Sequence, residues 1–169
     1  MKSNLILSDA NILIDLANLN LLEAFTQLNF ISYTTDFVLN ELNIEQQKLI
    51  GLLVQQGKMQ IISSDNQDIL AIYQLIAKVS GLSVQDCSVW YHFKKINATM
   101  LTGDRKLRKE AESDNIVVRG ILFVLDELLQ QHVLNFDQAL YSIKQLQQSN
   151  NRLPNDEINR RIAEWSKEN

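Results

Sequence analysis

The stretch Thr99–Gly120, TMLTGDRKLRKEAESDNIVVRG, decides the fold that this sequence predicts. It begins with a short apolar run, TMLTG, continues with a polar stretch of helical character, DRKLRKEAESD, and ends with a second apolar run, NIVVRG. A short apolar run bounded by turn residues is typical of a buried strand. Two such strands that are connected by a helix run parallel to each other in one sheet. The stretch therefore predicts a strand–helix–strand unit of a parallel sheet.

The same alternation of apolar runs and helical patterns continues on both sides of this stretch. Strands separated by helices imply a parallel sheet that is covered on both faces. The predicted fold class is therefore α/β, a three-layer α/β/α sandwich around a parallel sheet of about five strands, with extra C-terminal helices. The remaining expected strands are 5–8, 30–33 and 58–63, and the expected helices are 11–28 (as two short helices), 35–57, 64–81, 83–97, 121–132, 135–148 and 155–165.

The length of 169 residues suits one domain with a sizeable core. We expect the main domain over residues 1–134 and a helical extension over 135–169, which packs on that domain or on a partner. In the extension, Ile158, Ile162 and Trp165 form an apolar stripe at helical spacing. Packing on the chain's own domain is the favoured interpretation of this stripe, and a dimer contact or a partner-binding helix is the alternative.

The composition, 46% hydrophobic and 21% charged, is that of a soluble globular protein. No apolar run approaches the roughly 20 residues of a membrane span, and the first residues turn polar too soon for a signal peptide. The one cysteine, Cys87, rules out an internal disulfide, so we expect a cytoplasmic protein. With so few Cys and His side chains, any metal needs oxygen ligands, which favours Mg²⁺ or Mn²⁺ over zinc. Both histidines, His92 and His132, are expected as partly exposed helix residues.

Four acidic residues follow expected strands or open nearby helices, where the carboxyl ends of a parallel sheet collect ligands. Taken singly, each has a structural explanation: Asp9 and Asp104 can cap helices, and Asp86 resembles the acid of a capping box. Glu41 can be an exposed acid about two turns into the expected helix 35–57. The set is Asp9, Glu41, Asp86 and Asp104.

At one sheet edge, four carboxylates would repel one another strongly in a partly buried site. Folds tolerate such a cluster chiefly where divalent cations neutralise it, and oxygen ligands suit Mg²⁺ or Mn²⁺. Two such ions can clamp the attacking and leaving oxygens of an in-line phosphoryl displacement. Taken together, the four acids therefore favour a metal-dependent site that acts on phosphate esters.

Six basic residues gather between Lys94 and Lys109 with one acid among them, although the whole chain has a net charge of −4. A charge run of this kind is usually a solvated face. Because they lie next to Asp104, however, three of them are candidates for contacts with the backbone phosphates of a nucleic acid: Arg105, Lys106 and Arg108.

The ordered motifs resemble those of PIN-domain proteins, the ribonuclease fold of VapC-type toxins. The resemblance covers roughly Leu5 to Leu129, and the set of four motifs in this order carries it. The motifs are LSDANILIDL with Asp9 and Asn11, VLNEL with Glu41, GLSVQDCSVW with Asp86, and LTGDRKLRKEAE with Thr102 and Asp104.

The resemblance implies an endoribonuclease that hydrolyses RNA phosphodiester bonds with Mg²⁺ or Mn²⁺ as cofactor. It implies that the three aspartates are direct or water-mediated metal ligands and that Glu41 helps to orient metal-bound water. Asn11 and Thr102 would hydrogen-bond the carboxylates and fix their rotamers. Proteins of the toxin type are commonly homodimers paired with an antitoxin, so the expected partners are RNA, an antitoxin protein and a second copy of the chain. Asp15, one turn beyond Asn11, is expected at the surface.

Two other folds that place an acid after the first strand fit less well. A haloacid-dehalogenase phosphatase needs a second Asp where this chain has Asn11, and another where it has Arg108. A response-regulator receiver needs an acidic pair before Asp9, and the chain has none there. The stronger alternative is a catalytically silent PIN-like module that binds RNA or a protein partner.

Overall fold

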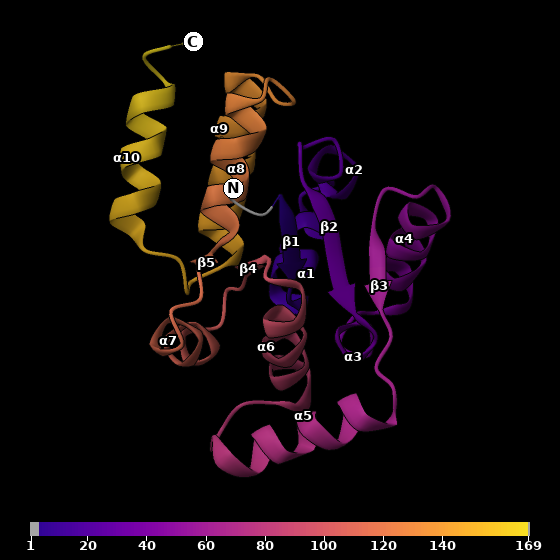
Figure 1. Ribbon diagram of the computed structural model, residues 1–169. Coiled ribbons are helices and arrows are strands. Elements are labelled where there is room, and N and C mark those ends of the chain that lie inside the picture. Colours follow the sequence, from indigo (N-terminus) through magenta and orange to yellow (C-terminus); the bar gives the residue numbers. More distant parts are fainter. Residues whose placement is uncertain (1–3, 169) are drawn as a thin grey trace.

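The computed structural model describes residues 4–168 and contains one five-stranded sheet near the centre of the molecule (Figure 1). The strand order is β3-β2-β1-β4-β5, and every neighbouring pair is parallel. The predicted α/β class with a parallel sheet is thereby confirmed. The strands are β1 (Leu5–Ser8), β2 (Ile31–Thr35), β3 (Gln60–Ile62), β4 (Thr99–Leu101) and β5 (Val118–Arg119).

The sheet has its topological switch point between β1 and β4. The chain adds β2 and β3 on one side of β1 and then crosses over to add β4 and β5 on the other. Ser8 pairs with Leu101, and one residue further on the N–H of Asp9 donates to the Leu101 carbonyl over 3.0 Å. Ligands of open parallel sheets bind at the carboxyl ends of the strands at such a point. Asp9 lies there.

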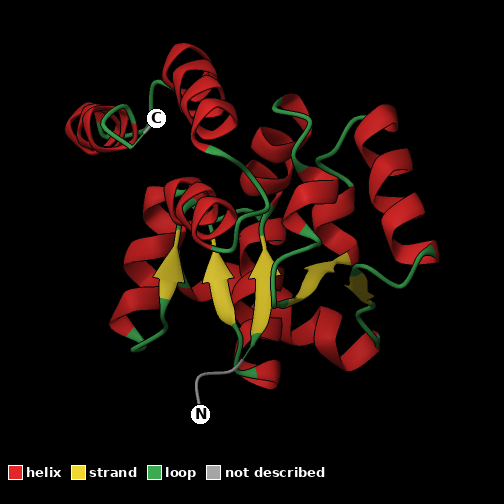
Figure 2. Ribbon diagram, turned by 90° about the horizontal axis from the view of Figure 1, so that it is seen from above, coloured by secondary structure: helices red, strands yellow, loops and turns green. Residues whose placement is uncertain are grey.

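Helices lie on both sides of the row of strands (Figure 2). The crossovers from β1 to β2 and from β4 to β5 run in opposite directions along the sheet, so right-handed connections put their helices on opposite faces. One helix, α6, packs on β1, β2 and β4, while α8 packs on α1 and α2. The helices of this part are α1 (Ala10–Asn18), α2 (Leu22–Phe25), α3 (Asp36–Leu39), α4 (Ile44–Gln55), α5 (Asn66–Lys78), α6 (Val84–Ile96), α7 (Arg105–Ser113) and α8 (Ile121–Gln130).

Two C-terminal helices continue the core at one corner of the molecule. α9 (Phe136–Ser149) packs on α8, and α10 (Asn155–Trp165) packs on α9 at the outside (Figures 1 and 2). Ile158 and Trp165 are buried in the same hydrophobic cluster as the sheet residue Leu7, so the apolar stripe of α10 faces the chain itself. Within residues 4–168, no helix combines the length and the apolar character needed to cross a membrane.

The expected single helix over 35–57 is wrong, because the chain divides it into α3 and α4. Asn43 leaves helical geometry, with φ −71° and ψ 169°, and forms a capping box with Gln46 at the start of α4. Glu41 therefore lies in the turn between two helices, and not on a helix.

The expectation that His92 is partly exposed is also wrong. Its side chain is buried, and its Nε2 lies 2.9 Å from the hydroxyl oxygen of Ser64. Burial lowers the pKa of His92, which favours the neutral ring. The face of α6 that carries His92 is covered because α5 packs along α6.

Candidate functional site

Asp9 is the most buried acid at the carboxyl edge of the sheet, with 3% of its surface exposed. It caps α1, because its Oδ1 accepts a hydrogen bond from the N–H of Ile12 over 3.1 Å. Its Oδ2 accepts a hydrogen bond from the hydroxyl of Thr102, which is buried directly after β4. Neighbouring strands thus bring a carboxylate and its donor to the same point.

The hydroxyl of Thr102 joins two of the predicted acids. It donates to Asp9 and accepts from the backbone N–H of Asp104 over 3.0 Å. A hydroxyl has one hydrogen to donate, and here that hydrogen is directed to the Asp9 carboxylate. Thr102 therefore fixes the orientation of Asp9 and ties it to the loop that carries Asp104.

Asp104 and Asp86 each make structural hydrogen bonds with only one carboxylate oxygen. Asp104 caps α7, where its Oδ1 accepts from the N–H groups of Lys106 and Leu107. Asp86 closes the capping box of α6, where its Oδ2 accepts from the N–H of Ser83 over 3.0 Å. Among residues 4–168, no hydrogen bond uses Oδ2 of Asp104 or Oδ1 of Asp86. Each residue can therefore act as a helix cap and still offer an oxygen to a ligand.

The three aspartates are coupled electrostatically. Burial raises the pKa of Asp9 from 3.8 to about 7, the hydrogen bonds from Thr102 and Ile12 oppose this rise, and the charges of Asp86 and Asp104 add to it. Repulsion between charges falls with distance. The acids that follow β1, open α6 and follow β4 are therefore neighbours at one edge of the sheet.

Glu41 borders this group from the turn after α3. Its side chain is exposed, partial burial raises its pKa, and the charge of Asp86 raises it further. Because the charge of Asp86 is the one that affects Glu41, Glu41 lies nearest the α6 end of the group of aspartates.

The donor chemistry fits a hard divalent cation, because the four acids supply only oxygen. As the side chains stand, residues 4–168 contain no group of three Asp, Glu, His or Cys residues placed to hold a metal ion. Mg²⁺ keeps several waters and is commonly bound through one or two carboxylates, which suits the free oxygens of Asp86 and Asp104. A cation would also neutralise the charges of Asp86 and Asp104, which add to the rise that burial causes in the pKa of Asp9.

The three basic residues predicted to contact phosphates differ in how firmly they are engaged. Arg105 is exposed, and its Nη2 donates to the carbonyl of Arg152 over 3.4 Å. Lys106 donates to a backbone carbonyl in the loop before α6. Arg108 is half-buried and donates to the carbonyl of Thr102 over 3.4 Å. Arg105 is therefore the freest of the three.

A contact that the sequence did not indicate joins the loop between α9 and α10 to α1. The Nδ2 of Asn150 donates to Oδ2 of Asp15 over 2.9 Å, and Nη1 of Arg152 donates to Oδ1 of Asn11 over 3.2 Å. In the described part of the chain, no hydrogen bond joins Asn11 to a carboxylate. Asp15, expected at the surface, is half-buried, and burial raises its pKa. Two positions one turn apart on α1 thus hold this loop.

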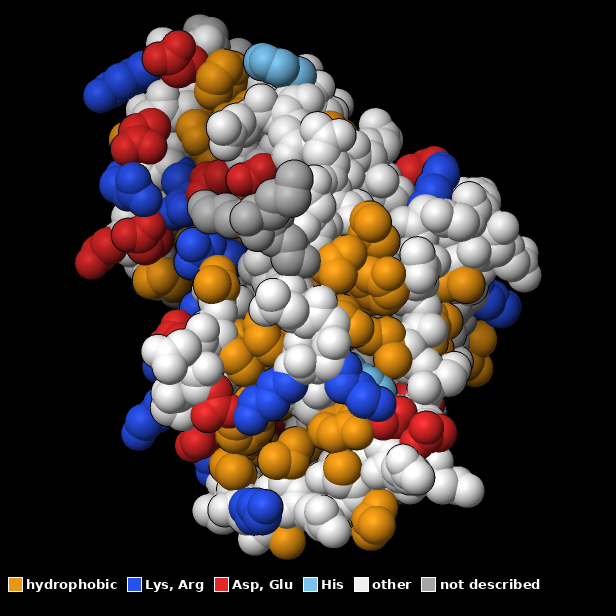
Figure 3. Space-filling model, viewed as in Figure 1, with side chains coloured by type: hydrophobic (Ala, Val, Ile, Leu, Met, Phe, Trp, Pro, Cys, Tyr) orange, Lys and Arg blue, Asp and Glu red, His pale blue; other side chains and the backbone are white. Residues whose placement is uncertain are grey.

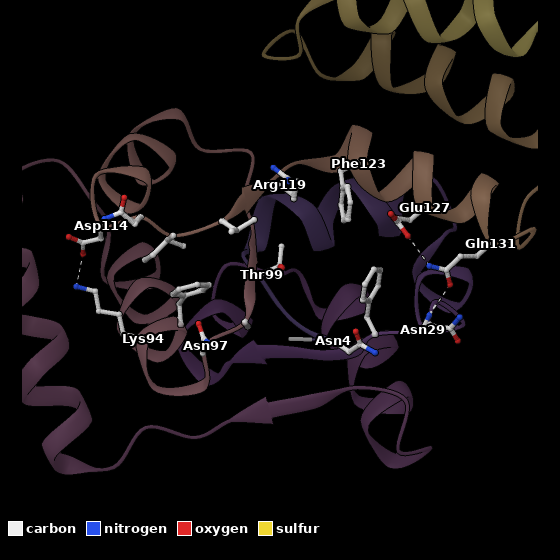
Figure 4. A pocket seen from close by; sticks show the side chains of 16 residues that line it. Asn4, Asn29, Lys94, Asn97, Thr99, Asp114, Arg119, Phe123, Glu127 and Gln131 are labelled. Carbon is white, nitrogen blue, oxygen red and sulfur yellow. Dashed lines mark hydrogen bonds and ion pairs between the residues drawn. The ribbon is translucent and has the colours of Figure 1, made fainter. Parts of the chain in front are cut away.

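A cavity of about 740 Å³ lies at the opposite, amino-terminal edge of the sheet, where β4 begins with Thr99 (Figure 4). In it, Lys94 and Asp114 lie 2.6 Å apart, Gln131 donates to Glu127 over 2.8 Å, and the guanidinium of Arg119 lies 5.8 Å from the centre of the Phe123 ring. None of the predicted acids is among its lining residues. We therefore place the candidate site at the carboxyl edge.

Replacing Thr102 by valine should lower the free energy of unfolding by about 2 kcal/mol at pH 8, because both partners of the hydroxyl lose a hydrogen bond. The pKa of Asp9, which this hydroxyl lowers, should rise further. Urea denaturation measures the first effect, and an NMR titration of the Asp9 carboxyl measures the second. Thr102→Ser keeps the hydroxyl and should stay close to wild type. Equal results for valine and serine would contradict a role of the hydroxyl.

Comparison by sequence identifies one family. A family model described as a PIN domain matches residues 5–167. Among curated proteins, no sequence matches. The matched region includes all of α9 and α10, which lie beyond the motifs that carry the resemblance in the sequence.

The solved structures with a similar fold include two of low sequence identity to this chain. VapBC2 from Rickettsia felis, solved bound to a DNA fragment from its promoter, is 16% identical with a TM-score of 0.46, and the match covers 69% of this chain and 98% of that chain. PAE2754 from Pyrobaculum aerophilum is 14% identical with a TM-score of 0.51, and the match covers 73% of this chain and 88% of that chain. At such identities the likeness concerns the fold alone.

Proposed function

This chain belongs to the PIN-domain family, and from that premise we propose that it is a divalent-metal-dependent endoribonuclease that hydrolyses RNA phosphodiester bonds. Membership of the family supports a nuclease. The observation that carries the proposal is the placement of three aspartates at the carboxyl edge of the sheet, where Thr102 bonds both Asp9 and the N–H of Asp104, and where, among the described residues, Asp86 and Asp104 each keep one carboxylate oxygen free of structural hydrogen bonds; burial raises the pKa of Asp9 to about 7. Three separate elements bring these acids to the switch point of the sheet although they repel one another, and a cation there would remove that repulsion.

In this proposal Asp9, Asp86 and Asp104 hold Mg²⁺ or Mn²⁺, directly or through water. When bound, the ion supplies an activated water and neutralises charge on the phosphate. Thr102 keeps Asp9 in one orientation through its hydroxyl. Glu41 has a raised pKa, which suits a carboxylate that orients the attacking water and accepts its proton.

The remaining predicted site residues are proposed to support the acids and to bind RNA. Asn11 lies on α1, two residues after the N-cap Asp9, and acts through the loop that it holds. Arg105, Lys106 and Arg108 are proposed to meet backbone phosphates, and the exposed guanidinium of Arg105, which makes one long hydrogen bond to a backbone carbonyl, supports this role best.

The test is cleavage of one single-stranded and one structured RNA by the wild type and Asp86→Asn, in Mn²⁺ and in EDTA. We expect cutting only with Mn²⁺ and a fall of at least about 100-fold in the variant. Asparagine can still accept the Ser83 N–H bond, so the fold should be retained. Equal cutting by both proteins would show a contaminating nuclease. No cutting by either would contradict the proposal.

The alternative is a catalytically silent PIN-like module that binds RNA or a protein partner. One observation favours it: in the described residues no three metal-binding side chains are gathered to hold an ion. RNA binding without Mn²⁺-dependent cleavage would support this alternative.

Partners and organisation are a further part of the proposal. The resemblance to VapC-type toxins supports an antitoxin partner and a homodimer, which light scattering and co-purification with a co-expressed neighbouring gene product would test. Limited proteolysis would test the division into residues 1–134 and 135–169. A cytoplasmic location stays a prediction.

A further inference from the structure

A cavity of about 610 Å³ lies between α7, the start of α8 and the loop that joins α9 to α10. Thr102 and Gly103, which directly precede Asp104, are among its lining residues. The cavity therefore borders the carboxylate edge at which we propose that RNA is cut, and α10 with its preceding loop closes the far side.

Arginine dominates the charged lining of this cavity, with five arginines against two acids. Arg161 is neutralised because it pairs with Asp126 over 2.6 Å and with Glu157 over 2.9 Å. Arg108 pairs with Glu112 over 3.4 Å. Within residues 4–168, the other three have no carboxylate within 4 Å, and they are Arg105, Arg119 and Arg152.

The hydrogen bonds of these three arginines are few and go to neutral acceptors. Arg105 donates to a backbone carbonyl over 3.4 Å, and Arg119 donates to the carbonyl of its neighbour over 3.3 Å. Arg152 donates to the amide oxygens of Asn11 and Asn150 over 3.2 and 3.4 Å. Each guanidinium carries five N–H donors, so most of them are available to a ligand.

The loop holds Arg152 in place through a buried amide. Asn150 is 8% exposed, and its Oδ1 accepts from the backbone N–H of Arg152 over 3.1 Å. Its Nδ2 donates in turn to Asp15 on α1. The guanidinium is therefore oriented before any ligand arrives, which reduces the entropy lost on binding.

We propose that this cavity binds a backbone phosphate of RNA beside the carboxylate edge, and that Arg152, in the loop between α9 and α10, is the phosphate-binding residue. Guanidinium groups bind phosphate oxygens through paired N–H donors, and unpaired positive charge favours an anionic ligand. The choice of RNA as the ligand rests on the proposed function. The existence of the cavity, its positive charge and its contact with α1 do not depend on the proposed function.

The test is binding of a fluorescent single-stranded RNA of about ten nucleotides in EDTA, between roughly 50 and 200 mM salt. One lost phosphate contact reduces the slope of log affinity against log salt by about 0.7. Arg152→Gln should show this reduction and bind about tenfold more weakly at the lowest salt. Arg152→Lys keeps the charge and should keep the slope.

Arg160→Gln is the matched control. Arg160 is an exposed arginine of α10 that lies 2.8 Å from Glu157 and 3.6 Å from Glu164, and it does not line the cavity. Figure 3 shows acidic and basic side chains side by side over α10. This variant should bind RNA as the wild type does.

The outcomes separate this inference from the proposed function. A wild-type slope in Arg152→Gln overturns the inference, as does an equal loss in Arg152→Gln and Arg152→Lys together with a lower melting temperature. Mn²⁺-dependent cleavage, measured separately, can survive either result. Conversely, a reduced slope in Arg152→Gln without any cleavage by the wild type would support the inference and contradict the nuclease.

Discussion

Asp104→Asn should reduce Mn²⁺-dependent RNA cleavage by at least about 100-fold and leave the melting temperature nearly unchanged. Asparagine is as good an N-cap as aspartate, so its Oδ1 can still accept from Lys106 and Leu107. The substitution removes one negative charge and one available carboxylate oxygen at the switch point of the sheet. Initial cleavage rates at saturating Mn²⁺, with thermal melts of the same samples, measure both effects.

Asp65 provides the matched control for this substitution. It caps α5 in the same way, because its Oδ1 accepts from the N–H groups of Gln67 and Asp68. Asp65→Asn should keep the wild-type rate. If it loses as much activity as Asp104→Asn, the loss comes from capping. If Asp104→Asn cuts at the full rate, Asp104 has no part in the reaction.

Asp9→Asn should abolish cleavage and yet stabilise the metal-free protein at pH 8 by about 2 kcal/mol. The carboxyl ionises with a pKa near 3.8 in the unfolded chain, and the fold raises this pKa to about 7. Between these values the unfolded chain binds fewer protons than the folded one, so stability falls as pH rises from about 4 to about 7. Above pH 7 the loss is complete.

The magnitude follows from two opposing effects of the Asp9→Asn substitution. A difference of about three pKa units corresponds to about 4 kcal/mol of free energy of unfolding. The wild type loses this amount when Asp9 ionises, and the variant, which has no ionisable group there, does not. Asparagine has one acceptor oxygen for the two donors, Ile12 and Thr102, and the lost hydrogen bond costs about 1–2 kcal/mol. Below pH 4 only the second effect remains, so the variant should be the less stable protein there.

Urea denaturation in EDTA at pH 4 and pH 8 measures this change of sign. Adding Mg²⁺ at pH 8 should stabilise the wild type more than the variant, because a ligand of the folded state raises stability by mass action. A wild type that is more stable than Asp9→Asn at both pH values would show that the ionised carboxylate carries no burial cost.

The two strands at the switch point could be predicted because each is a short apolar run followed at once by turn residues. Asp9 and Asp104 then fall at the carboxyl edge, since the position directly after a parallel strand fixes the edge on which a residue lies. Glu41 is different. Its place depends on the cap formed by Asn43, which interrupts a sequence whose apolar spacing continues as if it were one helix.

The sequence could not place Arg152 or Asn150, and it did not show that His92 is buried. The contacts of Arg152 and Asn150 with α1 span 141 and 135 residues, and they depend on how α8, α9 and α10 pack. The burial of His92 depends likewise on the packing of α5 along α6. Local periodicity identifies which face of a helix is apolar, but it does not identify what covers that face.

The loop between α9 and α10, which contacts α1, is synthesised late in the chain. All five strands and the four acids precede Asn150 in the chain, so they are synthesised before this loop exists. A nascent chain therefore passes through a stage in which all four acids have been made and Arg152 has not. On our proposals, the growing chain binds RNA more weakly at this stage than the complete protein does.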